Sequence, residues 1–115
     1  MEKELKTYNM IQWLLLPKFE RIMYSIAVCY RNKQRLHLNN GIILDFETMT
    51  IEIEKDIDFK VCSDSQWFFM SKYERMMYLI KLAYSCKTGF DFDNGLVLNF
   101  KTMTMEIEDG VNNND

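Results

Sequence analysis

The sequence predicts an α+β protein built by tandem duplication of one (β)αβββ unit, in which a helix packs on a three- to four-stranded antiparallel meander. Residues 12–56 align with residues 66–110 without a gap, and 20 of the 45 aligned positions are identical. In each unit, apolar residues first recur at helical spacing and then alternate at strand spacing. We therefore expect a first repeat at 1–56, a second repeat at 57–110 and a disordered tail at 111–115, with the two repeats forming one compact domain.

Each unit begins with an amphipathic pattern. Apolar residues recur at three- and four-residue steps from Leu16 to Tyr30, and the equivalent positions run from Met70 to Tyr84. This spacing places them on one side of a helix. The pattern predicts two long helices, at about 17–32 and 71–86.

Shorter elements are expected around the start of each long helix. Ser71, followed three residues later by Glu74, is a capping-box pattern that marks the start of the second helix. The apolar runs just upstream predict a short helical turn, and the segments before those predict a short strand. The turns fall at residues 13–16 and 67–70, and the strands at residues 5–8 and 57–62.

Three strands are expected after each helix, because apolar residues alternate there at period two. Asn39, Asn40 and Gly41 suit a three-residue hairpin loop with glycine in the left-handed region, which pairs Leu38 with Ile42. The same reasoning pairs Phe92 with Leu96 in the second unit. A four-residue loop at 47–50 then places Asp45 directly opposite Glu52.

Charge is divided between the two kinds of element. The helix regions 18–35 and 72–87 carry net charges of +4 and +3, whereas the strand regions 45–58 and 91–109 carry −5 and −4. The acidic residues lie on the outer side of the strands, which predicts a binding face for a partner with a basic surface. A solvated face that keeps the protein in solution, and a cation site, are the open alternatives. The predicted acidic binding face consists of Asp45, Glu52, Glu54, Asp91, Glu106 and Glu108.

A second candidate surface lies on each helix, away from the main apolar stripe. It combines arginine, tyrosine and an aliphatic residue, which is the composition of interface hot spots. The alternative is that the helices use this side to pack on each other or on the other unit. The predicted helix interaction face consists of Arg21, Tyr24, Val28, Arg75, Tyr78 and Leu82.

The sequence contains few groups that suggest catalysis. The single histidine, His37, is replaced by Asp91 in the second unit, and no pattern suggests a nucleophile with its base, a phosphate loop or a metal site. Three cysteines without an export signal indicate reduced thiols, which we expect to be buried and structural. We predict a protein that is not an enzyme and has no cofactor and no metal.

These observations favour a small, cytoplasmic protein-binding module. No apolar run reaches the ~18 residues that a membrane span needs, so no membrane partner is expected. The acidic, Lys-, Asn-, Ile- and Met-rich composition suggests a phage or mobile-element inhibitor of a host nucleic-acid-processing defence protein, which would place it in the host cell cytoplasm. A homodimer is left open. The alternative functions are nucleic-acid binding through the basic helices, which the net charge of −3 does not favour, and a ligand-binding or enzymatic site between the repeats.

Overall fold

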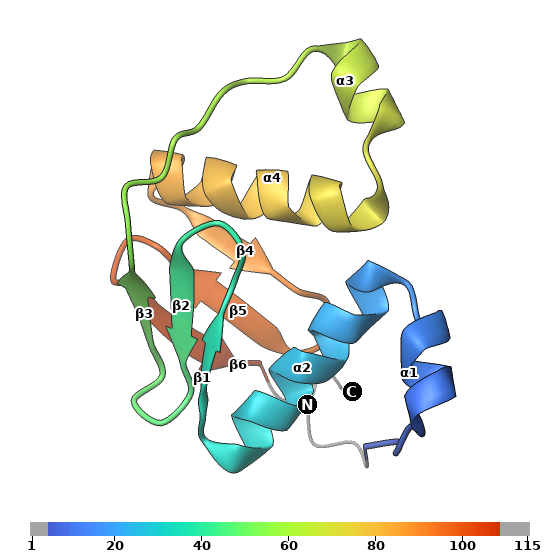
Figure 1. Cartoon of the computed structure of the whole chain (residues 1–115). Coiled ribbons are helices and arrows are strands. Elements are labelled where there is room, and N and C mark those ends of the chain that lie inside the picture. The colour runs from blue at the N-terminus through green and yellow to red at the C-terminus, as the bar shows by residue number, and fades with distance from the viewer. Residues whose placement is uncertain (1–4, 109–115) are drawn as a thin grey trace, which may run out of the picture.

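The computed structural model describes residues 5–108, and the predicted tail at 111–115 lies outside them. The described residues form an α+β fold with four helices and one six-stranded antiparallel sheet (Figure 1). Each element of the second half begins and ends 54 residues after its counterpart in the first half. The elements are α1 (Met10–Leu15), α2 (Lys18–Asn32), β1 (Arg35–His37), β2 (Ile42–Asp45), β3 (Thr50–Ile53), α3 (Asp64–Phe69), α4 (Lys72–Cys86), β4 (Gly89–Asp91), β5 (Leu96–Asn99) and β6 (Thr104–Ile107).

The two long helices confirm the predicted helices at 17–32 and 71–86, each starting one residue later than expected. Helix α4 begins with the predicted capping box: the N–H of Glu74 donates to Ser71 Oγ at 3.1 Å, and the N–H of Ser71 donates to Glu74 Oε1 at 2.9 Å. The N-cap residue of helix α2 is Pro17, which offers no capping side chain. Only the second long helix is therefore closed by side chains at its N-terminus.

The capping box makes the stability of α4 sensitive to one hydroxyl. Ser71→Ala is expected to lower the free energy of unfolding by about 1 kcal/mol, measured by urea denaturation.

The backbone N–H and then the hydroxyl of Ser71 lower the pKa of Glu74 below its ordinary value. The stabilisation by ionised Glu74 is therefore present above the ordinary pKa and is lost as pH falls through the lowered one. An NMR titration in which Ser71→Ala does not raise this pKa would contradict the assignment.

The strand prediction for residues 5–8 and 57–62 is wrong, because both segments lack regular secondary structure. The helical turns expected at 13–16 and 67–70 are present within the longer helices α1 and α3. The N-cap residues of these helices are Asn9 and Ser63, and each forms a capping box with the glutamine three residues later, Gln12 or Gln66. These polar caps satisfy backbone N–H groups at the start of each short helix.

The sheet joins two three-stranded meanders in the order β1-β2-β3-β6-β5-β4. The meanders meet where Thr50 pairs with Thr104. Beside this pair, the N–H of Ile51 donates to the carbonyl of Met103, and the N–H of Met105 donates to the carbonyl of Met49, both at 2.9 Å. The two bonds relate equivalent positions of the two halves, so the join between the meanders has approximate two-fold symmetry.

The first hairpin of each half confirms the expected pairing. The N–H of Leu38 donates to the carbonyl of Ile42 at 2.9 Å, and the N–H of Phe92 donates to that of Leu96 at 3.0 Å. Gly41 has a φ of 90°, in the left-handed region that favours glycine.

The second turn differs from the expected one. Asp45 lies opposite Thr50, and Glu52 lies opposite Ile43, so the prediction that Asp45 faces Glu52 is wrong. Asp45 Oδ1 accepts the N–H groups of Glu47 and Thr48, and the turn closes over residues 46–49, one residue earlier than expected. Local side-chain bonds to the backbone therefore set this register.

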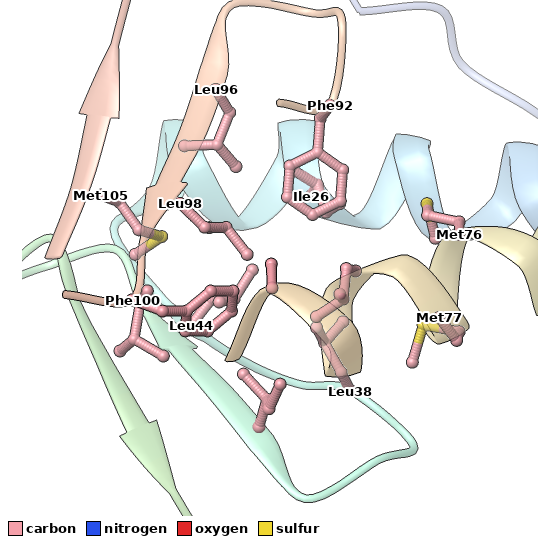
Figure 2. Close-up of a cluster of buried hydrophobic side chains, with 14 of the residues drawn as sticks. Ile26, Leu38, Leu44, Met76, Met77, Phe92, Leu96, Leu98, Phe100 and Met105 are labelled. Carbon is pink, nitrogen blue, oxygen red and sulfur yellow. The ribbon is translucent and has the colours of Figure 1, made fainter. Parts of the chain in front are cut away.

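The core is shared by both halves of the chain. Figure 1 shows α2 and α4 on one side of the sheet, and Figure 2 shows Ile26 and Leu44 of the first half close to Phe92 and Leu98 of the second. These side chains belong to a single cluster of buried hydrophobic residues. The predicted inward-facing strand residues are buried or partly buried in this cluster, and the central isoleucines of both helices, Ile26 and Ile80, have no exposed surface.

Candidate functional site

In the first half of the acidic outer face, side chains from β1 lie beside two of the carboxylates. Arg35 Nη2 lies 2.6 Å from Glu52 Oε1, and His37 Nδ1 lies 3.6 Å from Glu54 Oε2. Both pairs are about half exposed, so each contributes little to stability. Ile43, which lies between His37 and Glu52 in register, is only 4% exposed although it faces outward. This half of the sheet therefore presents paired charges over a covered apolar residue.

The second half of the same face has carboxylates without cations. Gly89 and Asp91 stand where β1 has Arg35 and His37. Within residues 5–108, no basic group lies within ion-pair distance of Glu106 or Glu108, and both are exposed. The negative potential of the outer face is therefore strongest over β4 to β6.

Two of the six predicted acidic residues have a local structural role. Asp45 Oδ1 accepts backbone N–H groups in the turn after β2. Asp91 Oδ1 accepts the N–H of Asp93 at 2.7 Å in the turn after β4. The structure thus places all six residues on or beside the outer face, but these two are engaged in turns.

The predicted helix face of α2 lies against helix α1. Arg21 donates from Nε to the carbonyl of Trp13 at 3.1 Å and from Nη2 to the carbonyl of Leu14 at 2.7 Å. The ring of Tyr24 meets that of Trp13 edge to face, with centroids 5.5 Å apart. A cation at the last carbonyls of a helix satisfies them and offsets its dipole. Arg21 and Tyr24 therefore attach α1 to α2.

The face of α4 repeats this arrangement with helix α3. Arg75 donates to the carbonyl of Trp67 at 3.1 Å and to that of Phe68 at 3.0 Å. The ring of Tyr78 lies 5.7 Å from that of Trp67, and its Oη accepts the N–H of Cys62 at 3.2 Å. Val28 and Leu82, the aliphatic members of the predicted face, are half-buried. The sequence argument considered contacts with the other helix or the other unit, whereas the observed contacts are with the segment just before each helix.

Helices α1 and α3, which we call the arm helices, expose large apolar side chains. Each is anchored by one tryptophan, so the rest of its apolar surface faces solvent. Six large apolar side chains on these helices are between 61% and 83% exposed: Met10, Ile11, Leu14, Leu15, Phe68 and Phe69. Exposed apolar patches of this kind mark interaction sites in monomeric proteins.

None of these six side chains is among the predicted site residues, although a sequence signal exists for Leu14, Leu15, Phe68 and Phe69. The runs at 13–16 and 67–70 each contain four successive apolar residues. Successive residues of a helix point about 100° apart, so a short helix on a surface cannot bury all four. The runs were interpreted only as helical turns, and their outward-facing members were not considered.

Other chemistry-bearing residues form no evident centre. Among residues 5–108, no group of three or more His, Cys, Asp and Glu side chains is placed to hold a metal ion. Burial raises the pKa of the half-buried Cys29 thiol. Cys86 is exposed, which corrects the expectation that every cysteine is buried. In the same described range, the helices are all too short or too polar to cross a membrane.

Comparisons with protein-family models, curated proteins and solved structures find no match to this chain. Function must therefore be argued from the residues of the chain itself.

Proposed function

We propose that this chain is a protein-binding module that docks on its partner through the arm helices α1 and α3. The observation that carries the proposal is the exposure of six large apolar side chains on two helices of six residues each. Leaving these side chains in water is unfavourable, and burying them against a partner would release about 25 cal/mol for each Å² of apolar surface.

The attachment of the arm helices supports this proposal. Isolated helices of six residues are unstable in water, because nucleation outweighs the few hydrogen bonds that form. Here each arm helix has a capping box at its start, and an arginine bonds its last carbonyls. The apolar side chains are thus presented in an ordered arrangement, which lowers the entropy cost of binding.

The open half of the acidic face is a second candidate surface for the same function. Glu106 and Glu108 have no basic side chain beside them among the described residues, whereas Arg35 lies beside Glu52 and His37 lies beside Glu54. Unpaired surface charge favours a basic partner and mainly raises the rate of association. A protein that grips nucleic acid carries such a surface, so inhibition of a host nucleic-acid-processing protein is the specific form of this proposal.

We also propose that the chain arose by tandem duplication of one ααβββ unit. The 54-residue offset shared by all ten elements and the 20 identical positions support this origin. The differences between the halves then indicate where the copies have diverged. One such difference is that β4 has Gly89 and Asp91 where β1 has Arg35 and His37.

The proposal can be tested by affinity capture from the native host with four double variants, followed by binding measurements on the purified partner. Leu14→Ser with Leu15→Ser, or Phe68→Ser with Phe69→Ser, is expected to weaken binding about tenfold or more, because exposed apolar anchors are lost. The fold should be retained, since these side chains are mostly exposed.

Charge variants separate the two surfaces. Glu106→Gln with Glu108→Gln should slow association and reduce its dependence on salt. Glu52→Gln with Glu54→Gln changes the net charge equally, at the half where the carboxylates are already paired, and should have a smaller effect. Partner affinity that is the same for wild type, both arm variants and the Glu106/Glu108 variant would reject the proposal.

A further inference from the structure

A pocket of about 410 Å³ lies between the turn after β1, residues 58–60 and helix α4. This volume is within the range of small-molecule sites in proteins. Phe59, Met70 and Met77 supply an apolar part of its lining. The pocket lies apart from the exposed apolar side chains of the arm helices and from the outer face of the sheet.

One polar atom at this pocket lacks a hydrogen-bond partner. Asn40 lines the pocket and is 7% exposed. Its Oδ1 accepts the N–H of Ile42 at 3.1 Å, which fixes the orientation of the amide and leaves Nδ2 buried without a partner in the described part of the chain. A buried donor without an acceptor is unfavourable. The equivalent Asn94 makes the same bond to Leu96 but is only half-buried.

Further donors line the same pocket as Asn40. Tyr73 Oη accepts a bond from Asn39 Nδ2, and Tyr78 Oη accepts one from the N–H of Cys62, both at 3.2 Å, so each hydroxyl still has its own proton to donate. Lys60 and Lys81 add two ammonium groups. Of the two carboxylates in the lining, Glu74 already accepts a bond from the N–H of Ser71. Asp58 is the other carboxylate, so the two carboxylates balance the charge of the two lysines, and Asn40 Nδ2 and the two tyrosine hydroxyls are the neutral donors of the lining.

Part of the polar lining has no counterpart at the equivalent residues. At the positions of Tyr73 and Lys81 in α4, helix α2 has Phe19 and Ala27. The position equivalent to Asn39 holds Asp93. Two of the five donors of this pocket are therefore absent from the equivalent residues, whereas the other three are kept as Lys6, Tyr24 and Asn94.

We propose that this pocket binds a small carboxylic acid with an aromatic or branched apolar body. The body contacts Phe59, Met70 and Met77, and the carboxylate accepts hydrogen bonds from Asn40 Nδ2 and from the tyrosine hydroxyls. Because Nδ2 is itself almost inaccessible in this structure, the carboxylate reaches it only when neighbouring side chains shift.

The test is an NMR titration of the ¹⁵N-labelled full chain with phenylacetate, with phenylacetamide and phenethylamine as comparison probes. We expect saturable shifts of the Asn40 side-chain amide and of the backbone amides around the pocket. Phenylacetate should bind more tightly than phenylacetamide, and phenethylamine should not compete. The absence of saturable shifts for phenylacetate at millimolar concentrations would overturn the proposal.

Two variants and a control assign the binding to Asn40. Asn40→Asp keeps Oδ1 for the N–H of Ile42 but replaces the donor with an oxygen, so phenylacetate should bind at least tenfold more weakly. Asn94→Asp makes the same change in the other hairpin and should leave binding unchanged. If Asn40→Asp does not fold, Met70→Trp decides the matter, because it fills the pocket from a half-buried position and should abolish binding. Unchanged affinity in Asn40→Asp, or in Met70→Trp, would contradict the assignment.

Discussion

Replacing Phe46 or Phe100 with alanine is expected to lower the free energy of unfolding by about 3–5 kcal/mol in each case. Both rings are 3% exposed, and each meets a tyrosine of the long helix in its own half edge to face, Tyr30 or Tyr84. The loss combines transfer of the ring from water, the cavity left behind and the aromatic contact. A loss of that size is a large part of the ~5–15 kcal/mol that a domain has in total.

Denaturant and thermal unfolding measure this effect. We expect each substitution to lower the melting temperature by on the order of 10 °C. Phe68→Ala is the matched control, because the same side chain is removed from a position that is 72% exposed, and it should leave stability almost unchanged. A shift of less than a couple of degrees for Phe46→Ala would mean that this side of the meander does not face the core.

Met105→Pro is expected to have the second large effect, because it removes one of the two hydrogen bonds beside the Thr50–Thr104 pair. The N–H of Met105 donates to the carbonyl of Met49 across β3 and β6. Proline has no N–H and is poorly tolerated inside a sheet. The side chain of Met105 is also 5% exposed, so its truncation alone should cost about 2–5 kcal/mol. The orphaned carbonyl should add about 1–3 kcal/mol.

Two companion variants separate these contributions. Met105→Ala removes the side chain but keeps the N–H, and Met105→Leu keeps both and should cost less than about 1.5 kcal/mol. Equal stability for Met105→Pro and Met105→Ala would show that the hydrogen bond across β3 and β6 contributes nothing. Because both halves share one core, the fluorescence of Trp13 and of Trp67 should report the same unfolding transition.

The regular elements could be predicted because their signals are local. Apolar spacing located α2 and α4 to within one residue, and the Asn-Asn-Gly and Asp-Asn-Gly loops determined the first hairpin of each half. The capping boxes at Asn9 and Ser63 are equally local signals, and they mark where helices α1 and α3 start. The sequence prediction instead has strands just before these positions. The register of the second turn depended on Asp45, whose bonds to two backbone N–H groups moved the turn by one residue.

The sequence by itself determined the fold class, the 54-residue period, the inward residues of the strands and the separation of acidic strands from basic helices. These properties depend on spacing along the chain, which the amino-acid order contains directly. Only the tertiary structure decided which charges are paired, because Arg35 reaches Glu52 from a neighbouring strand. It also decided that Arg21, Tyr24, Arg75 and Tyr78 hold the arm helices, and that Asn40 lies beside α4. Those relations join residues on different elements, so they arise only when the elements pack together, and the position of Asn40 also requires the two halves to share one core.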